Sequence, residues 1–408
     1  MNTDGYFEEN TLVVMSDLTL KPIKDIVVGD MIVGDDSTLR IVLEVKRDVC
    51  TMYMLCPVQG KGDGIICDEN QMLSLKCRDY RFGSGNKLEG RYRANWINSE
   101  FETKSRRFSV KSKEHPKGNY ESIEAAEKAV EALFASQPSM KDEIFCTTLK
   151  DYLSRSSRWR ENFCLYNVPV TFDYTPVEID PYIVGYWLGD GTTVEPSITT
   201  ENPEVVAYFN AYATSIGHVL TARKQQVDNA STTYRIRSTT SGHGKNKFLN
   251  SLRNYNLIGN KHIPPEYKYN SRDVQLKLLA GIIDSDGYCN GGTCYDICLK
   301  LENLVSDIAD LCITLGYTIN RATVEKTCTN SRNGRVTGTY YRMSVTSNDF
   351  SDLPLLLNYK RARDRVYKID SLSRSFDVAG YGGDINGIKL ELDGNKKFLL
   401  KDFVVAHC

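Results

Sequence analysis

Two related stretches decide the fold of this chain: Gly185-Tyr186-Trp187-Leu188-Gly189-Asp190-Gly191 and Leu279-Ala280-Gly281-Ile282-Ile283-Asp284-Ser285-Asp286-Gly287. Each is an apolar run with small residues that ends in an aspartate and a glycine, which predicts the last turns of a helix with the glycine as a left-handed cap. An aspartate there opposes the helix dipole by ~0.3–1 kcal/mol, so its presence twice needs a functional reason. The small residues would let the two helices pack backbone to backbone and bring Asp190 and Asp286 together. Paired carboxylates favour a hard cation such as Mg²⁺ between them.

The chain around these stretches is duplicated. Taken singly, the first stretch is better explained as an ordinary turn and the second as an ordinary buried helix. However, an amphipathic run follows each one and ends near a glycine: Gly217 lies 27 residues after Asp190, and Gly316 lies 30 residues after Asp286. Duplication on this scale predicts two equivalent half-domains related by a pseudo-twofold axis.

One later segment in each copy of the duplication resembles the other: Tyr234–Ser238 in the first and Tyr341–Val345 in the second. Both alternate between apolar and polar residues, which predicts strands with one buried face. The other face would carry Arg235, Arg237 and Arg342. For one strand alone, a solvated outer face is the simpler interpretation. Two such strands beside a paired aspartate site favour a ribbon that contacts the major groove of DNA.

These motifs resemble those of the double-motif LAGLIDADG homing endonucleases. Residues 279–287 match the family signature closely, and residues 185–191 match the more diverged first copy. The resemblance implies two αββαββα halves that meet at the motif helices. It also implies that Asp190 and Asp286 bind the catalytic metal, Mg²⁺ with Mn²⁺ as a substitute. Asp284 also falls within the signature, but the family's metal ligand is the later acid.

The resemblance further implies one basic catalytic residue from each half. Lys261 stands at the expected place in the first half, before His-Ile-Pro. In the second half we select Lys360, with Arg361 and Arg363 as close alternatives. The two ammonium groups could supply charge or orient water during phosphodiester hydrolysis. For each lysine, an ordinary solvated side chain is an equally good interpretation.

Both ends of the sequence resemble the protein-splicing (Hint) domain of the family that includes the yeast vacuolar-ATPase intein and the HO endonuclease. The resemblance rests on Asn10–Met15, Ile23–Asp30, Thr51–Tyr53, Cys67–Leu75 and Phe398–Cys408. We therefore expect an α+β chain in which a discontinuous all-β Hint domain contains an inserted pseudo-twofold endonuclease domain. The expected boundaries are 1–175 for the first Hint part with a basic insert at about 76–150, 176–372 for the endonuclease with repeats at about 180–260 and 272–365, and 373–408 for the second Hint part.

Several positions that protein splicing requires have changed. The aligned nucleophile position falls on Tyr6, whose phenol cannot perform the acyl shift, and the family histidine falls on Gln71, which cannot donate a proton as an imidazolium. The penultimate His407 is present, but Cys408 replaces the asparagine that would cyclise. We expect a free-standing relative that no longer splices.

Residues 76–117 form a basic segment with aromatic residues between the charges. It holds twelve Lys or Arg and five acids, a net charge of +7, whereas the whole chain carries −1. Such a segment is usually a solvated face. Its position in a DNA enzyme favours contact with phosphates. The predicted DNA-binding residues here are Arg78, Arg81, Arg91, Arg93, Arg106 and Arg107.

Together these observations predict a site-specific, Mg²⁺-dependent endonuclease that cuts double-stranded DNA. The resemblance implies a long recognition site, and we expect a monomer in the nucleus. The 408 residues hold no segment that resembles a signal peptide or a membrane span. Two alternatives are open: a decayed relative that binds DNA without cutting it, and an active self-splicing intein.

Overall fold

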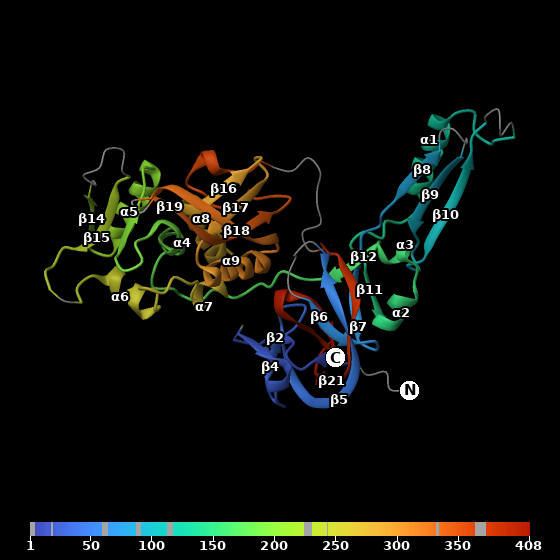
Figure 1. Ribbon diagram of the computed structural model, residues 1–408, viewed down its shortest axis with the longest axis horizontal. Coiled ribbons are helices and arrows are strands. Elements are labelled where there is room, and N and C mark those ends of the chain that lie inside the picture. The colour runs from blue at the N-terminus through green and yellow to red at the C-terminus, as the bar shows by residue number, and fades with distance from the viewer. Residues whose placement is uncertain are drawn as a thin grey trace.

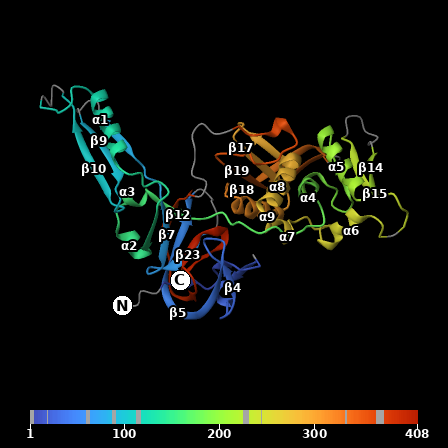
Figure 2. The ribbon, with the colours of Figure 1, turned by 180° about the vertical axis from the view of Figure 1, so that it is seen from behind.

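The computed structural model shows three parts (Figure 1). It describes residues 5–17, 19–58, 64–86, 91–111, 117–223, 231–242, 244–331, 334–363 and 373–408. Strands from both ends of the chain form one part, a sheet with a helix projects from it as an arm, and the two-half unit lies apart from the arm. Figure 2 shows the same separation from behind.

The part formed by both ends is built from two main antiparallel sheets. The first has the order β21-β1-β6-β5-β4, with β1 (Phe7–Glu8), β4 (Met31–Val33), β5 (Leu39–Pro57), β6 (Ile65–Asp68) and β21 (Phe376–Leu392). The second has the order β20-β12-β7-β23-β22 with β11 beside β7, and comprises β7 (Met72–Cys77), β11 (Ile144–Thr148), β12 (Phe163–Tyr166), β20 (Ser373–Arg374), β22 (Lys397–Leu399) and β23 (Val405–His407). Smaller elements are β2 (Leu12–Val14), β3 (Leu20–Pro22), η1 (Ile23–Asp25), α2 (Leu149–Ser154), α3 (Ser157–Arg160) and η4 (Lys401–Phe403).

The carboxyl-terminal strands complete both sheets. β21 pairs with β5 from Phe376 opposite Pro57 to Leu392 opposite Val42, and β23 pairs with β7 through Ala406 and Leu73. Apolar side chains from both ends of the chain share one core. This part is thus a discontinuous, mainly β domain with the two-half unit inserted between its parts, as expected for a Hint domain, although it also contains the short helices α2 and α3.

The arm consists of β8 (Phe82–Asn86), β9 (Arg91–Ile97), β10 (Thr103–Ser109) and α1 (Ile123–Ser136). Helix α1 begins where the Ser122 side chain accepts a hydrogen bond from the amide of Ala125, a common N-cap arrangement. Its apolar face packs on Ala94 and Phe108 of the sheet, so the arm has a small core of its own.

The inserted unit contains two similar halves. The first comprises α4 (Pro181–Asp190), β13 (Ser197–Thr199), α5 (Pro203–Ser215), β14 (His218–Arg223), β15 (Thr233–Ser238) and α6 (Lys247–Asn254). The second comprises α8 (Arg272–Asp286), β16 (Gly287–Asn290), β17 (Cys294–Leu299), α9 (Glu302–Thr314), β18 (Thr318–Ser331), β19 (Gly334–Thr346) and η3 (Asn358–Lys360), and α7 (Pro265–Lys268) joins the halves. The second half has a four-stranded sheet, β16-β17-β19-β18. In the first half, an isolated bridge between Gly191 and Ile198 stands in the place of the fourth strand.

The inserted unit and the Hint domain share an apolar contact. Val14, Val33 and Phe403 belong to the same buried cluster as the core of the two halves, and η4 lies against α9. No helix in the described part of the chain combines the length and apolar character that a bilayer span requires.

Candidate active site

The two motif helices, α4 and α8, pack backbone to backbone, as the sequence predicted. A Cβ added at Gly185 would stand 2.0 Å from the carbonyl oxygen of Leu278, and one at Gly281 would stand 2.2 Å from that of Tyr182. Any side chain at either position would therefore push the helices apart. Because the contact continues to the helix ends, the last residues of α4 and α8 lie next to each other.

The glycines after the two helices are not left-handed caps, and this part of the sequence interpretation was wrong. Gly191 has φ −78° and ψ 146°, and Gly287 has φ −78° and ψ 145°, so both are extended. A side chain is excluded for a different reason: a Cβ at Gly191 would stand 2.2 Å from the carbonyl oxygen of Trp187. Each glycine lets the chain turn straight from the helix into the sheet.

Asp190 and Asp286 form a carboxylate pair at the joined helix ends. A Cβ at Gly189 would stand 2.6 Å from Oδ2 of Asp286, so this carboxylate lies against the last turn of α4. Burial, and then the charge of Asp286, raise the pKa of Asp190 to about 6. Burial also raises the pKa of Asp286, against the opposing charges of Lys261 and Lys360.

Each helix end is also capped by one of the two selected lysines. Nζ of Lys261 donates to the carbonyl oxygens of Gly189 at 2.9 Å and Gly191 at 2.7 Å, at the end of α4. Nζ of Lys360 donates to three carbonyl oxygens at the end of α8, at distances of 2.8–3.1 Å. Burial lowers the pKa of Lys261 to about 8 and lowers that of Lys360 as well. The two halves therefore present matching aspartate–lysine arrangements.

The alternatives to Lys360 point elsewhere. Nη2 of Arg361 donates to the carbonyl oxygen of Leu355 at 3.0 Å, and the guanidinium of Arg363 lies beside Gly292. Of the three basic residues that the sequence offered in the second half, Lys360 is the one at the end of α8.

The two carboxylates suit a divalent cation. Asp190 is half-buried, and Asp286, although the residue as a whole is exposed, has its carboxylate against the last turn of α4, so a cation between them would relieve their repulsion. Within the described residues, no cluster of three or more His, Cys, Asp or Glu is placed to hold a metal. A metal at Asp190 and Asp286 would thus need oxygen ligands from water or substrate, which is the usual arrangement for Mg²⁺.

The predicted ribbon faces are confirmed. Ile236 and Met343 are buried, whereas Arg237 and Arg342 are exposed. Arg235 lies 3.4 Å from a carboxylate oxygen of Glu195. Arg342 makes a similar contact, 2.7 Å from Oδ2 of Asp296.

Two arginines of the arm are well placed to meet a polyanion. Arg93 and Arg107 lie opposite each other on β9 and β10, and both are exposed. Because Ala94 and Phe108 face α1, strand alternation puts Arg93 and Arg107 on the other face. Arg106 is exposed over the ring of Phe108, with 5.3 Å between the guanidinium carbon and the ring centroid.

The remaining predicted arginines differ in their surroundings. Arg81 donates to the carbonyl oxygen of Phe134 at 2.6 Å and to Oδ2 of Asp79 at 2.8 Å, so it caps the end of α1. Arg78 donates to the hydroxyl of Tyr80 at 3.2 Å. The side chain of Arg91 lies outside the described residues.

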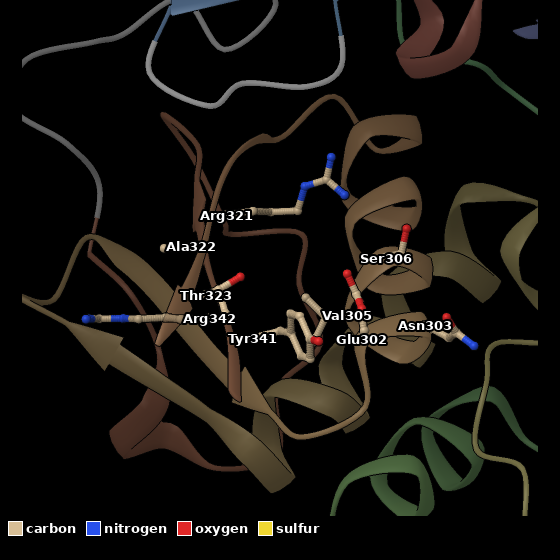
Figure 3. Close-up of a pocket in the computed structure, with 9 residues that line it drawn as sticks. All are labelled: Glu302, Asn303, Val305, Ser306, Arg321, Ala322, Thr323, Tyr341 and Arg342. Atoms are coloured by element: carbon tan, nitrogen blue, oxygen red, sulfur yellow. The ribbon is translucent and has the colours of Figure 1, made fainter. Parts of the chain in front are cut away.

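A cavity of about 460 Å³ lies between α9 and strands β18 and β19 (Figure 3). Its lining includes Glu302, Arg321 and Tyr341, and a hydrogen bond to Glu302 raises the pKa of the Tyr341 phenol. Neither Asp190 nor Asp286 belongs to its lining. The cavity is therefore separate from the carboxylate pair.

The predicted splicing positions lie together in the Hint domain. Tyr6 is buried, and its amide donates to Oδ1 of Asp68 at 2.9 Å. The side-chain amide of Gln71 donates to the carbonyl oxygen of His407 at 2.9 Å. Gln71 thus links the two ends of the domain through a neutral hydrogen bond.

The His407 ring is held in its neutral form. Burial and the charge of Lys397 lower its pKa to about 4, and Nε2 lies 2.7 Å from the hydroxyl of Ser74. The thiol of Cys408 donates to the carbonyl oxygen of Lys396 at 3.2 Å, and burial raises its pKa.

Comparison with known families identifies the class of protein. The family model described as Hom_end-associated Hint matches residues 6–407. The chain belongs to this family.

Two curated proteins are similar to the chain. The homothallic switching endonuclease of Saccharomyces cerevisiae is 23% identical over 467 aligned positions, which cover 96% of this chain and 78% of that protein. The replicative DNA helicase DnaB of Mycobacterium intracellulare is 25% identical over 276 residues, which cover 68% of this chain. The chain spans only 40% of the length of that helicase.

Solved structures also resemble parts of the chain. The gp41-1 intein is 27% identical over 17% of this chain and 52% of its own, with a TM-score of 0.15. The homing endonuclease I-DmoI in complex with DNA and Ca is 13% identical over 41% of this chain and 83% of its own, with a TM-score of 0.27.

Proposed function

We propose that the protein is a LAGLIDADG-type, Mg²⁺-dependent endonuclease that cuts both strands of a specific DNA site. The observation that carries the proposal is the pairing of Asp190 and Asp286 at the ends of α4 and α8, with one lysine at each end. We further propose that the enzyme acts as a monomer on a long site in the nucleus. Each half of its pseudo-twofold unit would then supply the aspartate and the lysine for the cutting of one strand.

The residues divide the chemistry between them. Asp190 and Asp286 would hold Mg²⁺, which supplies an activated water and stabilises the leaving oxygen when bound. Lys261 and Lys360 would place positive charge next to the phosphate that is attacked. Arg93, Arg107 and Arg237 would bind the phosphate backbone on either side of the cut, because all three are exposed on strands.

We also propose that protein splicing has been lost. Tyr6 offers no thiol or aliphatic hydroxyl for the first acyl transfer, and its amide is already bound to Asp68. Gln71 stays neutral where a protonated imidazole is needed. The Hint domain would then serve as a scaffold for the arm and for the inserted endonuclease.

The proposal is tested by cleavage of a genomic DNA library. Purified protein is incubated with the library and Mg²⁺, and the new ends are mapped by sequencing. We expect ends at one or a few sites, and none with Asp286→Ala. That variant should still bind the mapped site, because the substitution removes a metal ligand and no predicted DNA contact. Binding without cutting by the unmodified protein would instead identify a decayed DNA-binding relative.

A further inference from the structure

The segment that carries Lys360 is held by Asp284. The amide of Leu356 donates to Oδ2 of Asp284 at 2.8 Å, and the amide of Lys360 donates back to the carbonyl oxygen of Leu357 at 2.9 Å. Asp284 is 1% exposed, and its Oδ2 also accepts a hydrogen bond from the hydroxyl of Tyr182 at 2.9 Å. A buried carboxylate with two donors on one oxygen fixes the backbone four residues before Lys360.

The segment that carries Lys261 is held by a different acid, Asp307 of α9. The amide of Ile263 donates to Oδ2 of Asp307 at 3.0 Å. The other oxygen of Asp307 accepts from Nζ of Lys268 at 2.5 Å. Ile263 lies two residues after Lys261, so a shift of its backbone would move the base of the lysine side chain.

Both acids belong to the second half, and neither has an acidic counterpart in the first. The residue two before the final aspartate of α4 is Leu188, where α8 has Asp284. Helices α5 and α9 have the same length, and the position of Asp307 in α9 corresponds to Tyr208 in α5. The halves therefore match at their aspartates and lysines but differ in what holds the lysines.

We propose that Asp284 and Asp307 are positioning residues, one for each lysine, and that each therefore controls the cutting of a different DNA strand. The inference rests on the proposed endonuclease function. Each lysine caps the end of its own motif helix, Lys261 on α4 and Lys360 on α8. Loss of one anchor should thus displace one ammonium group and leave the other in place.

The test measures the nicking of each strand separately. A plasmid that carries the mapped site is labelled on either strand and treated with saturating enzyme, so that differences in binding do not enter. Asp284→Ala should slow one strand, and Asp307→Ala should slow the other, each by roughly 10- to 100-fold, the scale for a misplacement of about 1 Å. The ratio of the two nicking rates should therefore move in opposite directions in the two variants.

Two matched controls separate the backbone anchor from the rest of each network. Tyr182→Phe removes the other donor to Asp284 but leaves the bond from Leu356. Lys268→Met removes the ion pair of Asp307 but leaves the bond from Ile263. Both controls should keep the strand ratio of the unmodified enzyme.

If an alanine variant fails to fold, Asp284→Leu and Asp307→Leu, which fill the space but accept no hydrogen bond, should shift the strand ratio in the same direction. Asp284→Asn and Asp307→Asn retain an acceptor oxygen and should restore the normal strand ratio. A shifted ratio in the asparagine variants, or an equal slowing of both strands in the alanine variants, would overturn the proposal. If the unmodified enzyme cuts neither strand of any DNA, the proposed function fails and this inference fails with it. Normal cutting with unchanged ratios in the alanine variants overturns this inference alone.

Discussion

Replacement of Asp286 by asparagine should make the metal-free protein more stable at neutral pH. In the unmodified protein, Asp190 must ionise at neutral pH although burial and the charge of Asp286 raise its pKa to about 6. Asp286 itself has a raised pKa because burial outweighs the attraction of Lys261 and Lys360. The asparagine side chain would keep the shape of the aspartate. It would remove the repulsion of Asp190 and the cost of burying the Asp286 charge.

The size of the effect follows from the pKa of Asp190. A rise from 3.8 to about 6 corresponds to about 3 kcal/mol at 1.36 kcal/mol per unit. Solvent screening at this half-buried site reduces that figure, and burial is the larger of the two causes. Since the Asp286 charge is the second cause, the part of this ionisation penalty that disappears with it is about 1 kcal/mol. For a folding unit of this size, that stabilisation raises the melting temperature by roughly 2–4 °C.

The stabilisation should depend on pH in a defined direction. Between pH 3.8 and about 6 the folded state binds more protons at Asp190 than the unfolded state, so the stability of the unmodified protein falls as pH rises through this range. The difference in stability between Asp286→Asn and the unmodified protein should reach its full size above about pH 7. It should disappear near pH 4, where Asp190 is protonated in the folded state of both.

The measurement is thermal unfolding in EDTA from about pH 4 to about pH 8. Asp296→Asn is the matched control, because Asp296 forms an ion pair with Arg342 and its neutralisation should bring no gain in stability. A melting temperature of Asp286→Asn below that of the unmodified protein at neutral pH would refute the argument. The two motif carboxylates would then not repel each other in the folded protein.

Three further predictions concern activity and binding. Burial lowers the pKa of Lys261 to about 8, so the cleavage rate should decline above that pH as the ammonium group deprotonates. The Lys261→Arg variant should retain its cleavage rate to higher pH. A pH–rate profile of the unmodified enzyme that stays level to about pH 9.5 would contradict a role for the Lys261 charge. The double variant Arg106→Glu, Arg107→Glu should weaken DNA binding and reduce the slope of log K against log salt by about 1–2, since each lost phosphate contact lowers that slope by ~0.9. The control Arg81→Ala, which uncaps α1, should lower the stability of the arm without changing the slope. A fusion of the chain between two reporter proteins should produce no ligated reporter on a denaturing gel, and ligation would disprove the interpretation of Tyr6 and Gln71.

The features predicted correctly from the sequence are those that short patterns encode. Small residues in register on two apolar runs predicted the close packing of α4 and α8, and Gly185 and Gly281 make that contact. Alternation on two later segments predicted which face of each strand is buried, as Ile236 and Met343 show. Spacing and period are local properties, so the sequence displays them directly.

The features that were missed depend on partners distant in the chain. Asp307 binds an amide 44 residues away, and Asp284 binds one 72 residues away. Arg81 was interpreted as a DNA contact, yet it caps the end of α1, 53 residues later at Phe134. The prediction of left-handed caps was wrong for a related reason, because the extended conformations of Gly191 and Gly287 are set by the strands that follow. A single sequence contains no signal for such pairings.

The lysines explain why an aspartate can stand at the negative end of each motif helix. The last carbonyl groups of a helix carry about half a negative charge, which opposes a carboxylate. Lys261 and Lys360 donate to those same carbonyl oxygens, so each helix end is neutralised before a metal is bound. The ammonium groups are therefore placed by the helix ends as well as by the acids that hold their segments. It follows that removal of either lysine should destabilise the metal-free site as well as slow cleavage, because the aspartate would then face an uncapped helix end.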